Sequence, residues 1–289
     1  MSKAEPAKIK GKILIARARD ISIPVFSPSL RAVLALCGDR YVSADKISTV
    51  ISADYGLTFR LFRLMNSAFF SVRRKDLLSL KYMVVLLGLE NLAKAIVKVN
   101  VFIPERTPSA RVEPSVFYIA QGLLSSSIAG LLAEAAGFDS EKTSVMAMFR
   151  NLGDVISAIS IPEITSACLR GPFIDYGRFR SRCSGFTPET LAYQLSMYWN
   201  LPRLIRLVIC PQRFNFKEIN SEDSKLVLVS DTLNLLIRAG LLQRKGMKEY
   251  QEAKKQLASI LNMDEKKRLH CSQQFLPRAG LFCQSPGVC

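Results

Sequence analysis

Histidine is almost absent from this chain, since His270 is the only one among 289 residues. Metal sites built on several histidines, such as those of H-E-x-x-H hydrolases, are therefore excluded. A Ser-His-Asp or Cys-His catalytic unit would have to use His270, whose neighbours are mostly polar. The sequence also lacks the G-x-x-x-x-G-K-[ST] phosphate loop, G-x-G-x-x-G and G-x-S-x-G. The common catalytic motifs are thus missing.

Paired cysteines and long hydrophobic runs are missing as well. The seven cysteines are scattered and never form C-x-x-C, which argues against a zinc ribbon or a thioredoxin motif and favours reduced thiols. No apolar segment of signal-peptide length follows the charged N-terminus. The run Met83–Leu87 is far shorter than the ~20 residues of a membrane-spanning helix. We expect no targeting segment, no membrane span and a cytoplasmic location.

Apolar residues and positive charge are what the chain has in excess. It is 49% hydrophobic, with a mean hydropathy of +0.16, so it can bury a core. Its formal net charge is +16, divided as +4 over residues 1–20, +6 over 21–110, +1 over 111–240 and +5 over 241–289. A basic surface favours nucleic acid or another acidic partner, but a solvated surface that aids solubility explains the same excess.

Basic residues are the candidate contacts for an anionic ligand or a partner. They are Arg60, Arg63, Arg73, Arg74, Lys75, Arg150, Arg178, Arg180 and Arg182. Aromatic residues interleave with the last three, namely Phe173, Tyr176, Phe179 and Phe186. Aromatics beside arginines are typical of surfaces on which bases stack, although aromatics packed into a core give the same pattern.

The spacing of apolar residues predicts an all-α fold. Helical periodicity recurs along most of the chain, and alternating strand patterns bounded by hairpin turns do not occur. Helices are predicted over 30–37, from Ser43 as N-cap onward, over 57–68, 77–87, 92–99, 114–136 and 143–161, from Pro188 onward, and over 226–236. The carboxylate pairs Asp139/Glu141 and Glu222/Asp223 are expected at helix N-termini rather than as acid–base pairs.

Four blocks of the sequence resemble the HDOD family, the HD-related output domains of bacterial signalling proteins. The most specific block is Ile51–Phe70, ISADYGLTFRLFRLMNSAFF, and the others are Leu80–Leu92, Met148–Ser157 and Thr187–Ile209, in the expected order. Positions that match the family motifs are Leu64, Asn66, Ser67, Phe69, Gly88, Gly153, Trp199 and Pro202. The resemblance implies an HD-like helical fold in which an N-terminal helical bundle packs on a degenerate HD-like subdomain.

The same resemblance suggests how the chain is organised. We expect a basic segment over 1–19, an HDOD domain over 20–240 with subdomains 20–104 and 113–240, and a basic helix and tail over 241–289. By composition, the best internal boundary is 104–113, PERTPSARVE. The flanking segments are too short for a receiver or cyclase, so a stand-alone module is expected.

Catalytic HD enzymes bind metals through histidine and aspartate, and the resemblance shows what replaces those residues here. The first histidine falls near Gln121, the His-Asp pair on Arg150 and Asn151, and a later histidine position near Gln212. An arginine is always cationic and has no lone pair for a metal, and Asp154 alone is not a metal site. We therefore expect no metal, no cofactor and no enzymatic activity.

Arg150 has two possible roles at this position. Its guanidinium could hold an anion such as a nucleotide phosphate, or it could pair with a neighbouring carboxylate such as Asp154. We favour the ion pair.

The sequence thus predicts a non-catalytic regulatory module that acts through a protein partner of a signalling pathway. One alternative is a regulator that binds nucleic acid or a nucleotide through its basic surface. A second, disfavoured alternative is a residual metal-dependent phosphohydrolase.

Overall fold

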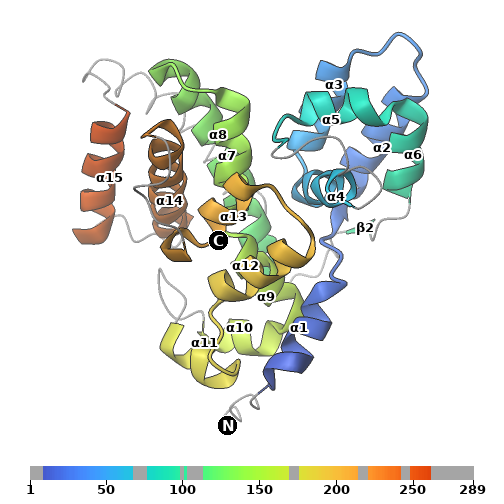
Figure 1. Cartoon of the computed structure of the whole chain (residues 1–289). Helices are drawn as coiled ribbons and strands as arrows, with labels where there is room; N and C mark the ends of the chain where they lie inside the picture. Colours follow the sequence, from blue (N-terminus) through green and yellow to red (C-terminus); the bar gives the residue numbers. More distant parts are fainter. Residues whose placement is uncertain are drawn as a thin grey trace, which may run out of the picture.

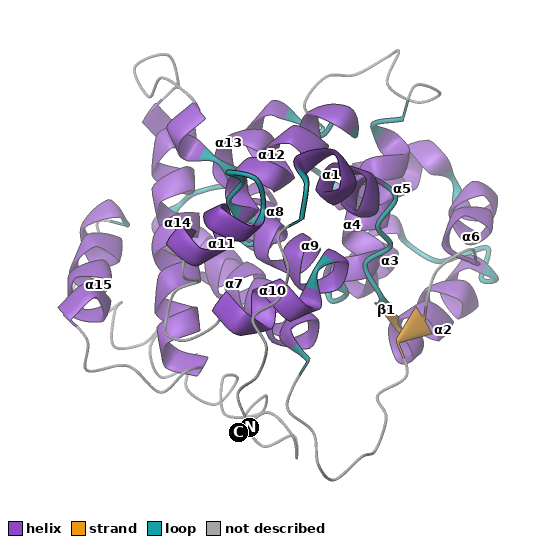
Figure 2. Ribbon diagram, turned by 90° about the horizontal axis from the view of Figure 1, so that it is seen from below, coloured by secondary structure: helices purple, strands orange, loops and turns teal. Residues whose placement is uncertain are grey.

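Helices form almost all the regular structure of this computed structural model, so the all-α prediction is confirmed (Figure 2). The structure describes residues 9–67, 77–97, 101–102, 113–168, 176–213, 221–241 and 248–261. The Arg73–Lys75 cluster, Phe69, His270 and most of segment 104–113 lie outside these residues.

Among the described residues up to 102, six helices and two very short strands form the N-terminal part. The helices are α1 (Gly11–Arg19), α2 (Ser27–Cys37), α3 (Ala44–Ser52), α4 (Tyr55–Met65), α5 (Leu80–Leu87) and α6 (Leu89–Val97). The strands β1 (Val25–Phe26) and β2 (Val101–Phe102) pair in parallel. The first of the resembling blocks is fixed here by Asp54, a buried residue whose carboxylate accepts hydrogen bonds from the backbone N–H of Phe26 and Leu57.

The remaining helices build the C-terminal part around α7. They are α7 (Pro114–Ala136), α8 (Ser140–Phe149), α9 (Leu152–Ser160), α10 (Pro162–Cys168), α11 (Tyr176–Arg182), α12 (Pro188–Tyr198), α13 (Arg203–Ile209), α14 (Ser221–Leu241) and α15 (Lys248–Ile260), with a 3-10 turn, η2 (Pro211–Arg213). In Figure 1, α7 and α8 lie at the centre, with α2–α6 on one side and α14 and α15 on the other.

Helix ends follow the local signals of the sequence. The Ser43 side chain accepts a hydrogen bond from the backbone N–H of Lys46 at 3.3 Å and caps α3. Gly88 and Gly137 end α5 and α7 at φ of +71° and +77°, a backbone conformation that glycine adopts without steric cost. These predicted boundaries are confirmed.

The single helix predicted over 143–161 is wrong, because the structure has two. α8 ends at Phe149 and α9 begins at Leu152. Between them the Asn151 side chain makes hydrogen bonds to other parts of the chain, which apolar periodicity cannot reveal. The periodicity runs through the break since both helices face the same core.

One apolar core joins the two parts, and Phe149 lies within it. The Phe149 ring is fully buried and makes edge-to-face contacts with Tyr55, Phe59 and Phe62, with ring centroids 5.2–6.3 Å apart. The α4 segment is thereby packed against the end of α8.

Helix α7 is, within the described ranges, the one helix long and apolar enough to cross a membrane. However, 61% of its most apolar window is buried inside the protein. Since neighbouring helices cover much of its apolar surface, α7 has the character of a core helix.

The substitution Phe149→Ala is expected to lower the free energy of unfolding by about 3–5 kcal/mol, because it removes a buried ring and leaves a cavity. Chemical denaturation followed by circular dichroism measures this change. Tyr41→Ala is the control, since Tyr41 is 97% exposed and its loss should change stability by about 0.5 kcal/mol or less. Equal effects of the two substitutions would contradict the placement of Phe149.

Candidate functional site

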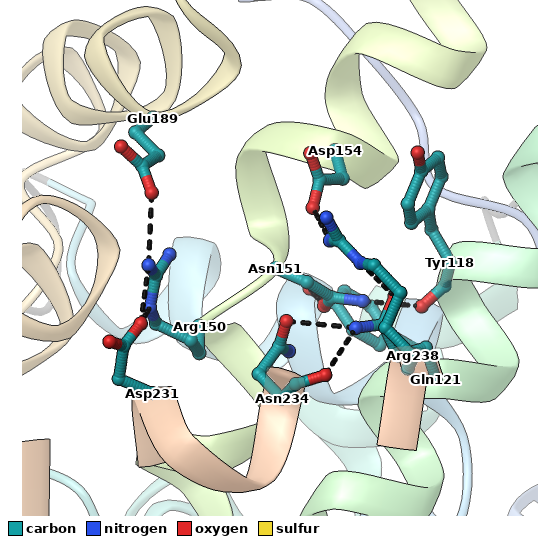
Figure 3. A network of polar contacts seen from close by, with 10 residues as sticks. Tyr118, Gln121, Arg150, Asn151, Asp154, Glu189, Asp231, Asn234 and Arg238 are labelled. Carbon is teal, nitrogen blue, oxygen red and sulfur yellow. Dashed lines mark hydrogen bonds and ion pairs between the residues drawn. The ribbon is translucent and has the colours of Figure 1, made fainter. Parts of the chain in front are cut away.

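Two residues at the predicted HD-like positions, Gln121 and Asn151, form a buried polar cluster with Asp154 and helix α14. Gln121 lies on α7, Asn151 lies at the break between α8 and α9, and Asp154 lies in the first turn of α9. Figure 3 shows them with Asn234 and Arg238, which α14 contributes. All five side chains are buried.

The Gln121 side chain uses both ends of its amide. Its Nε2 donates to the backbone oxygen of Asn234 at 3.0 Å and to Asn234 Oδ1 at 2.8 Å. Its Oε1 accepts from Nε of Arg238 at 3.3 Å. Gln121 therefore binds α14 through both ends of its side chain.

The centre of the site is an ion pair between Arg238 and Asp154. One Nη atom of Arg238 bonds the Asp154 carboxylate, and each residue is only 6% exposed. Burial raises the pKa of Asp154, and the Arg238 guanidinium acts in the opposite direction. The guanidinium carbon also lies 5.4 Å from the centroid of the Tyr118 ring. The positive charge of this cluster is thus carried by Arg238, which lies on α14.

Asn151 joins α4 to α7. Its Nδ2 donates to the backbone oxygen of Tyr118 at 2.6 Å, and its Oδ1 accepts from the Tyr55 hydroxyl at 3.3 Å. Complete burial raises the pKa of Tyr55 well above its usual range, so the hydroxyl remains a donor at neutral pH. Both the amide nitrogen and the amide oxygen of the Asn151 side chain therefore have hydrogen-bond partners.

Arg150 points away from this cluster, as Figure 3 shows. Its Nε donates to Asp231 at 2.6 Å, and its Nη2 donates to Glu189 at 2.9 Å. The prediction of an ion pair for Arg150 is confirmed, but Asp154 as its partner is wrong. The reason is that Arg238 reaches Asp154 from α14, whereas Arg150 connects α12 with α14. Gln212 lies in η2, with its side chain outside the described part.

Two of the candidate basic contacts are used inside the fold. Arg60 Nε donates to the backbone oxygen of Ala95 at 2.7 Å, and Arg63 Nη1 donates to that of Ile21 at 2.9 Å. Arg63 also lies 4.9 Å from the Trp199 ring centroid. The residues Arg178, Arg180 and Arg182 lie on α11, where the neighbouring Phe179 is fully buried and so belongs to the core.

No three His, Cys, Asp or Glu side chains are gathered closely enough to hold a metal ion in the part of the chain that is described. The one carboxylate among the HD-like positions and their neighbours in this cluster is Asp154, which Arg238 already binds. The arrangement can therefore hold helices together through matched polar contacts.

The family model for the HDOD domain matches residues 23–213. The chain belongs to the HDOD family. The resemblance recognised in the four sequence blocks is thereby confirmed.

Solved structures share the fold of this HDOD protein. The MmoQ response regulator from Methylococcus capsulatus is 18% identical, with 83% of this chain and 98% of that chain covered and a TM-score of 0.57. A virulence factor from Campylobacter jejuni is 15% identical, with 88% and 98% covered and a TM-score of 0.59. The search of curated proteins gave no match.

The HDOD motif positions within the described ranges have structural contacts. Asn66 and Ser67 donate to backbone oxygens at the end of α4, and Trp199 Nε1 donates to the backbone oxygen of Arg19 at 3.0 Å. A Cβ at Gly153 would collide with the backbone of Pro188, so α9 and α12 approach closely here. Leu64 packs against the core, Gly88 ends α5, and Pro202 precedes α13.

The sequence prediction did not include the α14 residues Asp231, Asn234 and Arg238. A signal for them exists, since they are spaced three and four residues apart in a largely apolar segment. This spacing places them on one face of a helix. Polar residues that recur on one face of a largely apolar helix indicate polar partners, although they do not identify them.

Arg238→Met is expected to destabilise this HDOD domain by about 3–5 kcal/mol, because it leaves the Asp154 carboxylate buried without a partner. Urea unfolding measures the change. The double variant Arg238→Met with Asp154→Leu should lose less stability than Arg238→Met alone, since neither buried charge remains. Arg40→Met, which removes an exposed arginine, should change stability by about 0.5 kcal/mol or less. A double variant that is less stable than the single one would contradict the ion pair.

Proposed function

We propose that this HDOD protein is a non-catalytic regulatory module of the cytoplasm that acts by binding another protein. The observation that carries the proposal is the Arg238 guanidinium bound to Asp154, between the residues at the former metal positions. The positive charge beside these positions is therefore that of the Arg238 side chain.

A divalent metal would find few usable ligands among these residues. Asp154 is already paired, and the oxygens of Gln121 and Asn151 accept hydrogen bonds from Arg238 and Tyr55. Metal binding would leave the buried guanidinium of Arg238 without its carboxylate and beside a second cation, which is unfavourable at low dielectric. The cost of replacing the Arg238–Asp154 pair with a metal–Asp154 contact argues against metal-dependent hydrolysis.

A regulatory module without catalytic activity acts through the molecules that it binds. A response regulator is among the structures that share the fold, which supports a place in signalling, although fold alone does not fix function. The net charge of +16 supports the second candidate, a regulator that binds nucleic acid. Against it, Arg60, Arg63 and Arg150 make contacts inside the fold.

Metal loading separates the non-catalytic module from a phosphohydrolase. Metal-free protein is incubated with Mn²⁺ or Fe²⁺, desalted and measured by elemental analysis, and nucleotide hydrolysis is followed in parallel. We expect less than stoichiometric metal and no turnover, because the HD-like positions are occupied by mutual contacts. An active HD phosphohydrolase treated in the same way is the control. Stoichiometric metal together with turnover would contradict the proposal.

Reciprocal capture from the native host tests the protein contact. The tagged chain should recover one defined protein, that protein should recover the chain, and excess untagged chain should compete. Nuclease treatment precedes each capture, and recovery that depends on nucleic acid would favour the second candidate. The variants Arg73→Glu/Arg74→Glu and Arg178→Glu/Arg182→Glu carry the same charge change and compare the two basic clusters. Failure to obtain any reciprocal, competed partner would count against the proposal.

A further inference from the structure

A polar pocket of about 470 Å³ lies beside the ion pair of Arg150 and Glu189. The end of α11, the 184–187 turn, the first half of α12 and η2 line it. Its volume is in the range of small-molecule sites.

Two arginines give the pocket its character. Arg180 comes from α11 and Arg213 from η2, and neither has a carboxylate partner among the described residues. The one lining carboxylate is Glu189, which Arg150 binds at 2.9 Å. The charge left over in the pocket is therefore positive, and guanidinium groups are suited to phosphate through paired hydrogen bonds.

The other lining groups suit the rest of a nucleotide-sized molecule. Phe186 offers an aromatic ring, and Gln194 offers an amide with both donors and an acceptor. The Arg213 guanidinium carbon lies 5.8 Å from the Tyr193 ring centroid, which restricts where the charge sits. The N-terminus of α12 is already capped by Thr187 and Thr190, so the arginines rather than the helix end are the anion-binding groups.

The turn at the pocket rim is held by the N-terminal chain. Ser184 and Gly185 both have positive φ, at 50° and 87°, and such a conformation is unfavourable for serine. Ser184 Oγ donates to the backbone oxygen of Ile9 at 2.7 Å, and the Ile9 N–H donates to that of Arg182 at 2.8 Å. These bonds fix the turn, and with it Phe186, in place.

We propose that this pocket binds a phosphorylated small molecule of nucleotide size, with its phosphate held by Arg180 and Arg213 and its planar base against Phe186. Such a ligand would act as a regulatory signal that is separate from the binding of a protein partner. This proposal does not depend on the existence of that partner.

Isothermal titration calorimetry at low ionic strength tests the pocket with AMP and GMP, with adenosine and guanosine as phosphate-free probes, and with inorganic phosphate. We expect a nucleotide to bind and its nucleoside to bind on the order of tenfold more weakly or not at all. Arg180→Ala and Arg213→Ala should each weaken nucleotide binding by a similar factor. Arg213→Lys should weaken it as well, because a lysine keeps the charge but not the paired hydrogen bonds.

Arg178→Ala is the matched control, since Arg178 lies on the same helix and its loss changes the net charge equally, but it does not line the pocket. It should leave binding unchanged. Thermal unfolding midpoints establish that each variant is folded. The proposal is overturned if no phosphorylated probe binds, or if Arg178→Ala weakens binding as much as Arg180→Ala. Inorganic phosphate that binds as tightly as the nucleotides would overturn the nucleotide-sized ligand.

Discussion

The buried ion pair between Arg238 and Asp154 constrains the C-terminal part of this HDOD domain. Removing two charges from water costs several kcal/mol for each ion, and only close pairing with further hydrogen bonds compensates. Arg238 meets this condition by bonding both Asp154 and Gln121. Helix α14 must therefore stay packed against α7 and α9, although it lies beyond residues 23–213 that the family model matches. The packed structural unit of this chain therefore extends past the residues that the family model matches.

The residues at the predicted HD-like positions are held by polar contacts within the fold. Gln121 and Asn151 each supply a donor and an acceptor, and each finds partners for both. Two arginines cross the same interface in opposite directions. Arg238 reaches from α14 to α9, and Arg150 reaches from the α8–α9 break to α14. Polar contacts from both sides thus connect α14 with α7, α9 and the α8–α9 break.

The sequence predicted those features that local chemistry determines. Ser43 and Gly137 mark helix ends because capping and positive φ depend on a few neighbouring residues. The break at Asn151 and the partner of Asp154 depend on residues far along the chain, since Arg238 and Asp154 are 84 positions apart. Periodicity identifies a face of a helix but not what covers it. The fold class and the family were therefore predictable, whereas the contacts around Asp154 were not.

A continuous chain of polar contacts connects the proposed ligand pocket to α14. Glu189 lines the pocket and binds Arg150, and Arg150 also binds Asp231 on α14. The Asp231 side chain is 51% exposed, and an ion pair that is open to water in this way contributes little to stability. The Arg238–Asp154 pair is buried, so breaking it would leave an uncompensated charge inside the protein. Helix α14 thus carries one exposed contact that leads to the pocket and one buried contact that fixes it on α9.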